Sequence, residues 1–218
     1  MFGGLALSYD KVLDWTTLLQ DRYWKRWAVA KASPSQADIV LDIGCGTCVT
    51  EERLMVKGCR MVGLDMTEEM LRLGARKGLG VALFNGDAEA LPFADASFDV
   101  VISFYVVKYC RIERFISEIA RVLKPGGRIV IYDFVRPRGS ASPILAFYIY
   151  GVLRIAGRLL RHVDPGVSYT FERLPGIVRA TMWNEDLPPV LERFHLAVAE
   201  QATLSGGTVE ALLVKRAA

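Results

Sequence analysis

The sequence predicts an α/β fold with a seven-stranded, mostly parallel sheet, helices on both faces and an antiparallel last strand. Short apolar runs of strand length alternate with segments of helical periodicity along most of the chain. This alternation is typical of right-handed βαβ crossovers. The chain has 218 residues, of which 52% are hydrophobic and 23% charged. That length and composition suit one globular domain with a full core.

The first half of the chain supplies the regular alternation. An N-terminal helix is expected over 9–32, because apolar and aromatic residues recur there at helical spacing up to the breaking pair Ser33 and Pro34. Helical segments are expected at 49–57, 68–77 and 112–123. The strand-like runs are 39–43, 60–64, 81–85, 100–104 and 128–132.

The regularity stops after the fifth strand and resumes near the end. A polar break at 136–139 precedes an apolar helical stretch at 144–160. A helix over 185–193 and strands at 196–203 and 209–214 follow. The two strands are joined by Ser205-Gly206-Gly207, a turn short enough for a hairpin, so the last strand should run antiparallel to its neighbour.

These elements predict a single domain over 1–218. Its parts are an N-terminal helical segment, a core in two pieces and an inserted helical cap after strand five. The expected boundaries are 1–35 for the segment, 36–135 and 180–218 for the core, and 136–179 for the cap.

Charge and cysteine content limit the partners and the compartment. A net charge of +3 and a pI near 8.7 are too mild to indicate a nucleic-acid partner. Residues 136–179 carry seven arginines and two acids, a net charge of +5, so the positive charge is concentrated in the cap. Four cysteines form no disulfide framework and no leader peptide opens the chain, which favours the cytoplasm, with peripheral contact at the inner face of the membrane as a variant.

The most informative stretch is residues 40–47, which read VLDIGCGT. A buried strand ends at Asp42, and Gly44 and Gly46 then allow the backbone to approach a ligand closely, as in the first turn of a nucleotide-binding βα unit. Asp65 ends the second strand about 20 residues later, where an acid accepts hydrogen bonds from both ribose hydroxyls. Asp87 follows the third strand, where a carboxylate can accept the exocyclic amine of adenine.

Cys45 and Cys48 form a C-x-x-C pair within this turn. Such a pair can bind zinc or carry redox chemistry. Zinc would need two further ligands, and the sequence has neither a second C-x-x-C nor paired histidines, since His162 and His195 stand apart. We therefore expect no metal and interpret the cysteines as small residues packed in a tight turn.

A dinucleotide cofactor does not fit the turn. Its fingerprint requires a third glycine where this chain has Val49, and it requires a helix N-terminus free for a pyrophosphate. S-adenosylmethionine (AdoMet) has no phosphate. Its cationic amino-acid tail suits the acidic Asp42 opposite the glycine turn.

The chain resembles the class I AdoMet-dependent methyltransferases in five stretches taken together: DIGCGT at 42–47, VGLDM at 62–66, GDAEALPF at 86–93, SFD at 97–99 and RVLKPGG at 121–127. The resemblance implies a Rossmann-like fold, AdoMet as the cofactor, S-adenosyl-L-homocysteine as its product, and no metal. It implies cofactor contacts from Asp42, Gly44, Cys45, Gly46, Asp65, Met66, Asp87, Ala88 and Phe104.

A narrower resemblance, to the C-methyltransferases of menaquinone and ubiquinone biosynthesis, spans nearly the whole chain. It rests on SYD at 8–10, DRYW at 21–24, the region 146–160, SYTF at 168–171, GIVR at 176–179 and LSGGT at 204–208. It implies ring methylation of a prenylated quinol, a lipophilic small molecule. The substrate-binding residues it implies are Tyr9, Tyr105, Tyr148, Tyr169 and Arg179.

The chain departs from that family at two places. Cys48 stands where the family usually has a third glycine, and residues 104–109 replace a stretch that carries an Arg-Asn pair. Because that stretch faces the transferable methyl group in the family, the second departure bears on the acceptor and leaves the cofactor assignment intact.

The cap also favours a lipophilic acceptor. Arg154, Arg158 and Arg161 share one face of a helix whose remaining surface is largely apolar. A bilayer span needs about 20 apolar residues, and arginines interrupt this one. Residues 144–161 therefore form either a basic amphipathic helix on an anionic membrane surface or a lid packed on the domain. Either arrangement places an apolar wall over the site of methyl transfer.

Methylation at a ring carbon requires a deprotonated hydroxyl on the acceptor, which a general base can assist. The candidates are His162, Asp164 and Tyr169, although Tyr169 can equally line the pocket and His162 lie on the surface.

Two other functions stay open. The first is a phospholipid-headgroup N-methyltransferase, and the second is a non-catalytic AdoMet-binding subunit, which only Cys48 and the altered stretch favour. Arsenic methylation is disfavoured, because its thiols would have to converge on the methyl group while three of the four cysteines lie near the cofactor turn. The sequence leaves the oligomeric state open.

Overall fold

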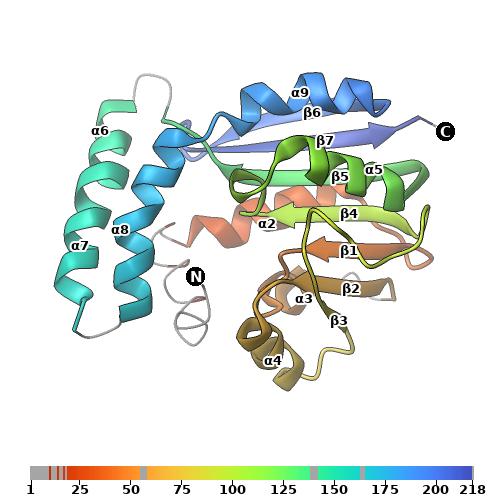
Figure 1. Ribbon diagram of the computed structural model, residues 1–218, viewed down its shortest axis with the longest axis horizontal. Helices are drawn as coiled ribbons and strands as arrows, with labels where there is room; N and C mark the ends of the chain where they lie inside the picture. Colours follow the sequence, from red (N-terminus) through yellow and green to blue (C-terminus); the bar gives the residue numbers. More distant parts are fainter. Residues whose placement is uncertain are drawn as a thin grey trace.

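A computed structural model describes residues 10, 14, 17, 19–54, 58–137, 142–162 and 165–217. Seven strands form one sheet in the order β3-β2-β1-β4-β5-β7-β6 (Figure 1). β7 is antiparallel to β5 and β6, whereas the pairs among β1 to β5 are parallel. The predicted sheet with its antiparallel last strand is confirmed. The strands are β1 Ile39–Ile43, β2 Arg60–Asp65, β3 Ala82–Asn85, β4 Phe98–Phe104, β5 Leu123–Phe134, β6 Leu196–Leu204 and β7 Val209–Arg216.

The helices follow the predicted alternation, with different ends. The helix expected to run to 57 is described only as far as Leu54, and β5 begins five residues earlier than expected, at Leu123, because that residue pairs with Phe98 across a bulge. The helices are α2 Gln20–Ala32, α3 Val49–Leu54, α4 Glu68–Arg76, the 3-10 turn η2 Val107–Tyr109, α5 Ile112–Val122, α6 Ser142–Phe147, the π-helical η3 Tyr148–Val152, α7 Leu153–Leu160, α8 Pro165–Ala180 and α9 Trp183–Arg193.

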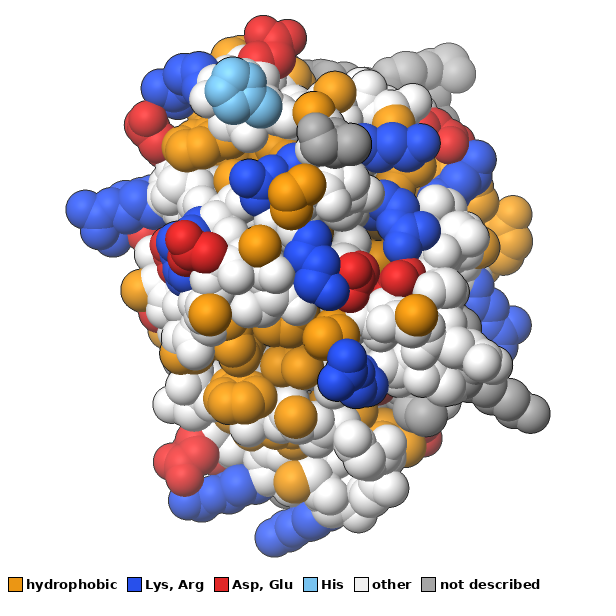
Figure 2. Space-filling view, turned by 90° about the vertical axis from the view of Figure 1, so that its right-hand side faces the viewer, with side chains coloured by type: hydrophobic (Ala, Val, Ile, Leu, Met, Phe, Trp, Pro, Cys, Tyr) orange, Lys and Arg blue, Asp and Glu red, His pale blue; other side chains and the backbone are white. Residues whose placement is uncertain are grey.

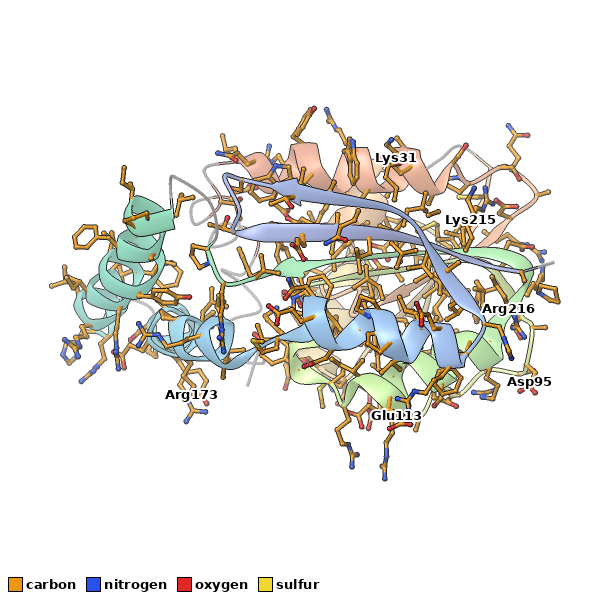
Figure 3. All side chains as sticks on the ribbon, turned by 90° about the horizontal axis from the view of Figure 1, so that it is seen from above. Lys31, Asp95, Glu113, Arg173, Lys215 and Arg216 are labelled. Carbon is orange, nitrogen blue, oxygen red and sulfur yellow. The ribbon has the colours of Figure 1, made fainter. Side chains whose placement is uncertain are left out.

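Side chains alternate between two cores, one on each face of the sheet. Leu41 and Ile43 of β1 lie in a core with Phe115 of α5 and Trp183 of α9. Val40 belongs to the opposite core, where α2 packs on the sheet. Figure 3 shows α2 on one side of the sheet and α5 and α9 on the other. Successive residues of a strand point to opposite faces, so a strand covered on both faces must be apolar throughout, as 39–43 is except at Asp42.

The strand order reverses between β1 and β4, which defines the edge where a ligand is expected. Asp42 of β1 is in register with Gly63 of β2 and with Ile102 of β4. In open parallel sheets, ligands bind outside the carboxyl ends of the strands at such a reversal. The fold therefore places the ends of β1, β2 and β4 around one site.

Four helical segments, α6, η3, α7 and α8, cap this edge of the sheet. α6, η3 and α7 form one helical run, which packs against α8 at the end of the molecule toward which β1 and β4 point (Figure 1). α7 and α8 approach closely at Gly157, where an added Cβ would lie 2.9 Å from Cβ of Phe171. The helix expected over 144–160 is present. α8, which contains Pro175, was not among the expected helices.

One helical run among the described residues, Pro143–Leu160, meets the length and composition of a membrane span. Its mean hydropathy is 1.4 and 12% of it is buried. One such run is a weak indication of a span. This one is 18 residues long and carries Arg154 and Arg158.

The end of the molecule opposite the cap carries charges of both signs. Figure 2 shows Lys and Arg side chains interspersed with Asp and Glu across this face. Asp95 and Arg216 both lie at this end (Figure 3). The guanidinium of Arg121, 2.9 Å from the Asp95 carboxylate, is one of the ion pairs there.

Candidate active site

The turn after β1 depends on two glycines with left-handed backbone. Gly44 has φ +80° and Gly46 has φ +55°. An added Cβ on Gly44 would lie 2.2 Å from Cγ2 of Val106, so the turn passes directly against the segment after β4. The same addition at Gly46 would meet no described atom within 4 Å. The backbone at Gly46 therefore faces open space, as a ligand-binding turn requires.

Asp65 connects the end of β2 to this turn. Its carboxylate accepts the backbone N–H of Gly46 at 2.9 Å and that of Thr67 at 2.8 Å. Burial raises the pKa of Asp65. Beyond it the Met66 side chain is exposed, and after β3 the exposed Asp87 accepts the N–H of Glu89.

Asp42 and Glu51 form a buried acidic pair behind the turn. The carboxylate oxygens of both residues lack a hydrogen-bond donor among the described residues. Burial, together with the charge of Glu51, raises the pKa of Asp42 well above its usual range. Burial likewise raises the pKa of Glu51 to about 7. A buried carboxyl pair without donors is costly, and a cation offsets that cost.

The pair fits the cationic part of AdoMet, because an ammonium group supplies the missing charge and donors. Lys25 of α2 is the buried cation nearest to this chemistry: its charge lowers the pKa of Asp42 and of Glu51, and its amine lies 3.2 Å from the Asp21 carboxylate. Sequence reasoning identified Asp42 but missed Glu51 and Lys25, because nothing in the spacing brings α2 or α3 to the end of β1.

Cys48 has a left-handed backbone, a conformation that favours glycine. It has φ +60° and is fully buried. Its Sγ lies 2.6 Å from the position of an added Cβ on Gly74 of α4, and Sγ of Cys45 lies 2.7 Å from that of Gly63 of β2. Because Gly63 and Gly74 carry no side chain, there is room for the sulfurs of Cys45 and Cys48.

The stretch after β4 forms a buried hydrogen-bond network with α2. Tyr105, at φ +65°, donates its hydroxyl to Asp21 at 2.8 Å, and Tyr132 donates to the same oxygen at 3.2 Å. The two hydroxyls also contact each other. Burial raises the pKa of both tyrosines well above the usual range, so both stay neutral. Phe104 packs edge-on against Tyr132.

A buried ion pair lies beside this network. The Lys108 ammonium is 2.7 Å from Asp133 at the end of β5 and donates to the carbonyl of Tyr105 at 2.6 Å. It also lies over the rings of Tyr105, Tyr109 and Phe134. Sequence reasoning singled out the stretch 104–109, which contains Lys108, but did not identify the pairing of Lys108 with Asp133. Asp42 and Asp65 were predicted because each is an acid at the end of a parallel strand. The same reasoning applies to Asp133.

A cavity of about 250 Å³ lies between the cap and the body of the domain. Its wall combines α2, the end of β5, the cap helices and the β6–β7 turn. Phe134 in this wall stacks on Tyr105, with ring centroids 4.8 Å apart. The lining is mostly apolar: Thr17, Gln20, Trp24, Phe134, Ile144, Leu145, Tyr148, Leu153, Leu174, Val178, Ser205 and Thr208.

Only some of the residues predicted to bind the acceptor lie at the cavity. Tyr148 lines the cavity, whereas His162, Tyr169 and Arg179 are not part of its wall. His162 is exposed at the end of α7, and the rings of Tyr169 and Tyr150 pack under the guanidinium groups of Arg173 and Arg179. Arg173 projects away from the sheet (Figure 3). Tyr9 and Asp164 lie outside the described residues.

Comparison with known proteins agrees with this geometry. Residues 41–131 match the methyltransferase domain family. A demethylmenaquinone methyltransferase of Mycobacterium sp. (strain KMS) is 38% identical over 206 residues, which cover 94% of this chain and 80% of that protein. One from Streptomyces avermitilis is 31% identical, covering 96% and 90%. A SAM-dependent methyltransferase structure from Thermotoga maritima has a TM-score of 0.65 at 18% identity, covering 99% and 97%.

The fold and the glycine turn define an AdoMet-dependent methyltransferase with a Rossmann-like sheet. AdoMet is its cofactor, and the protein is an enzyme. The sequence identities to the two demethylmenaquinone methyltransferases show a closer relationship than a shared fold alone. The chain belongs to the demethylmenaquinone methyltransferase family.

Proposed function

We propose that this enzyme transfers the methyl group of AdoMet to a ring carbon of a prenylated quinol, as in menaquinone or ubiquinone biosynthesis. The observation that carries the proposal is the largely apolar cavity of about 250 Å³ under the cap, beside the carboxyl ends of the strands. Small-molecule sites are commonly apolar clefts with a few polar groups. The names of the relatives, demethylmenaquinone methyltransferases, support the same acceptor class.

The cofactor is held by the turn and by the acids around it. Asp65 would accept the ribose hydroxyls, Asp42 with Glu51 would receive the ammonium of the tail, and Lys25 would pair with its carboxylate. The backbone of Gly44, Cys45 and Gly46 would hold the tail. Met66, Asp87, Ala88 and Phe104 are the candidates for the remaining contacts.

Bound AdoMet supplies an activated methyl group on a sulfonium. The chain's own contribution is to align the acceptor with that methyl and to exclude water, which an apolar wall at the cavity does. Tyr148, in the cavity wall, and Tyr105, stacked on Phe134 of that wall, are our candidates for holding the acceptor in the cavity. Tyr169 and Arg179, which are not part of the described wall, and Tyr9 stay sequence-based predictions for the acceptor. His162, Asp164 and Tyr169 likewise stay sequence-based predictions for the base that takes the acceptor's hydroxyl proton.

The helical run from α6 to α7 is proposed to lie on an anionic membrane surface at the inner face of the membrane. Its Ile144, Phe147 and Leu159 are each at least 70% exposed, and the exposed Arg154 and Arg158 flank them. Apolar side chains bordered by arginines suit the boundary between lipid headgroups and acyl chains. A lipophilic acceptor would then reach the cavity directly from the bilayer.

Methylation of a phospholipid amine is less well supported by the described residues. A cationic acceptor calls for carboxylates or open aromatic faces. The described cavity wall has no carboxylate, and its aromatic residues are Trp24, Phe134 and Tyr148. The aromatic group formed by Tyr105, Tyr109 and Phe134 already surrounds the ammonium of Lys108.

Mass spectrometry of lipid extracts tests the proposal, after incubation with the purified enzyme and methyl-labelled AdoMet. We expect the label in the quinone fraction. Label in phospholipid would replace the proposal by the N-methylation alternative, and label in neither fraction would reject both. Calorimetry tests the binding of AdoMet itself: no heat of binding at high AdoMet concentration would contradict the cofactor site.

A cavity-filling pair of variants sharpens the assignment. Leu153→Trp should fill the cavity and raise KM for the lipophilic acceptor, because Leu153 is buried in its wall. Leu159→Trp, on the exposed side of the same helix, should leave KM nearly unchanged. AdoMet affinity should be unaffected in both. Equal effects of the two variants would contradict the assignment of the acceptor to this cavity.

A further inference from the structure

A cluster of potential metal ligands lies at the cofactor turn, and none of its residues lines the cap cavity. Sγ of Cys45, Sγ of Cys48 and a carboxylate oxygen of Glu51 all lie within 4.8 Å of one another. The three side chains are buried, with exposures of 6%, 0% and 0%. The three ligand atoms therefore come from one short stretch, 45–51, at a spacing of three residues.

We propose that Cys45, Cys48 and Glu51 bind a thiophilic divalent cation of the Zn²⁺ or Cd²⁺ type. Two thiolates and a carboxylate form a donor set that such d¹⁰ ions accept in a tetrahedral site. The group of mutually close ligand atoms does not include Asp42, so a water molecule would take the fourth position. The inference is independent of the methyl acceptor.

The unpartnered carboxylates point to a cation at this place. Both oxygens of Glu51 and both oxygens of Asp42 are buried without a hydrogen-bond donor among the described residues. The acidic groups of Asp42, Glu51, Cys45 and Cys48 converge here, and the charge of Lys25 and, at Glu51, that of Lys77 oppose them. A buried carboxylate without donors costs free energy that a metal ion repays.

The sulfurs distinguish this site from one built only for the cofactor. An ammonium gains nothing from two thiols, whereas thiolates are strong ligands for Zn²⁺ and Cd²⁺. Gly63 and Gly74 leave room for the two sulfurs, which lie 2.7 Å and 2.6 Å from the positions their Cβ atoms would occupy. Cys48 accepts a left-handed backbone, φ +60°, to present its sulfur there.

Binding exchanges protons for the metal. Each thiol releases its proton to solvent as the cation binds, the Glu51 carboxyl releases its proton where it is protonated, and no electron is transferred. Because Glu51 would serve both ligands, the metal and AdoMet should each weaken the binding of the other by the same factor.

The test is a titration of the full-length protein with Cd²⁺ alone, in a thiol-free phosphine reductant and without AdoMet or acceptor. We expect a sulfur-to-cadmium charge-transfer band in the near ultraviolet that saturates at one ion per chain. Cys45→Ser and Cys48→Ser should abolish it. Glu51→Gln, a near-isosteric change, should weaken Cd²⁺ binding by at least about tenfold.

Cys59→Ser and Cys110→Ser serve as matched controls, because these cysteines lie outside the cluster and should leave the band intact. Absence of the band, its persistence in Cys48→Ser, or its loss in Cys59→Ser would overturn the proposal. Thermal unfolding of each variant checks that it is folded. Methyl transfer plays no part in this readout, so failure here and failure of the quinol assignment are separate results.

Discussion

The ammonium of Lys108 lies 2.7 Å from the carboxylate of Asp133, and the two side chains are 2% and 0% exposed. A second Lys–Asp pair, Lys124 with Asp99, has nearly the same separation of 2.8 Å, but its side chains are 37% and 26% exposed. The two pairs differ chiefly in solvent access, so they isolate the effect of burial on a broken ion pair.

Lys108→Met should lower the free energy of unfolding by about 3–5 kcal/mol, because it leaves the Asp133 carboxylate buried without its cation. Lys124→Met should cost less than about 1 kcal/mol, since water screens the partner that remains. Urea denaturation measures both. Similar losses from the two variants would contradict the burial of the first pair.

The two glycines of the cofactor turn should respond differently to alanine. Gly44→Ala forces a Cβ to within 2.2 Å of Val106, so the turn must shift and we expect a loss of more than about 2 kcal/mol of stability. Gly46→Ala meets no described atom and should cost only about 1 kcal/mol for its backbone conformation. Its larger effect should be on AdoMet affinity. Thermal unfolding and calorimetry separate the two outcomes.

Asp65→Asn should weaken AdoMet binding by roughly 10- to 100-fold, the loss expected when hydrogen bonds to a charged group are removed. Isothermal titration calorimetry measures the change. Glu68→Gln, which alters an exposed acid just beyond β2, is the control and should bind AdoMet normally. Unchanged affinity in Asp65→Asn would remove Asp65 from the cofactor site.

The pH dependence of stability should carry the signature of Glu51. Burial raises its pKa from about 4.5 to about 7, so the folded state holds a proton that the unfolded state loses. The contribution of Glu51 to the free energy of unfolding is therefore fully present below pH 4.5. It is lost as pH rises toward 7, and the free energy of unfolding then falls by up to about 1.4 kcal/mol per pH unit. Glu51→Gln should flatten this part of the curve, whereas Glu69→Gln, on the exposed face of α4, should not.

Membrane contact can be tested through the cap arginines. Changing Arg154 and Arg158 together to Gln should weaken binding to vesicles containing anionic phospholipid by roughly 30-fold, at about 1 kcal/mol for each basic residue. Flotation with such vesicles measures it. The matching double change at Arg114 and Arg193, on α5 and α9, removes the same charge and should have little effect. Equal losses would indicate attraction by net charge alone.

The fold was largely predictable because its signals are local. Apolar runs mark the strands, and turn residues such as Ser205-Gly206-Gly207 mark the hairpin. α8 was missed because Gly166, Pro175 and Gly176 interrupt its pattern, and because its helical conformation depends on packing against α7. The early start of β5 was missed for a related reason: pairing of Leu123 with Phe98 is a contact between distant residues.

The position of two acids around the turn was also predictable, because acids at strand ends follow from the topology of a parallel sheet, whereas their contacts with AdoMet stay predictions. Asp42 and Asp65 both lie around the turn. Lys25 and Asp21 were not predictable, since their contacts depend on how α2 lies across the sheet. The roles of His162, Asp164 and Tyr169 stay predictions.

The cap supplies half of the cavity wall from one uninterrupted segment, 142–180, inserted between β5 and α9. The turn and the acids of the cofactor site come from a separate stretch, 42–87. Exchanging the cap between two relatives would thus need one genetic crossover at each end of the segment. A lineage can acquire a new acceptor by that route while inheriting an unaltered methyl-donor half.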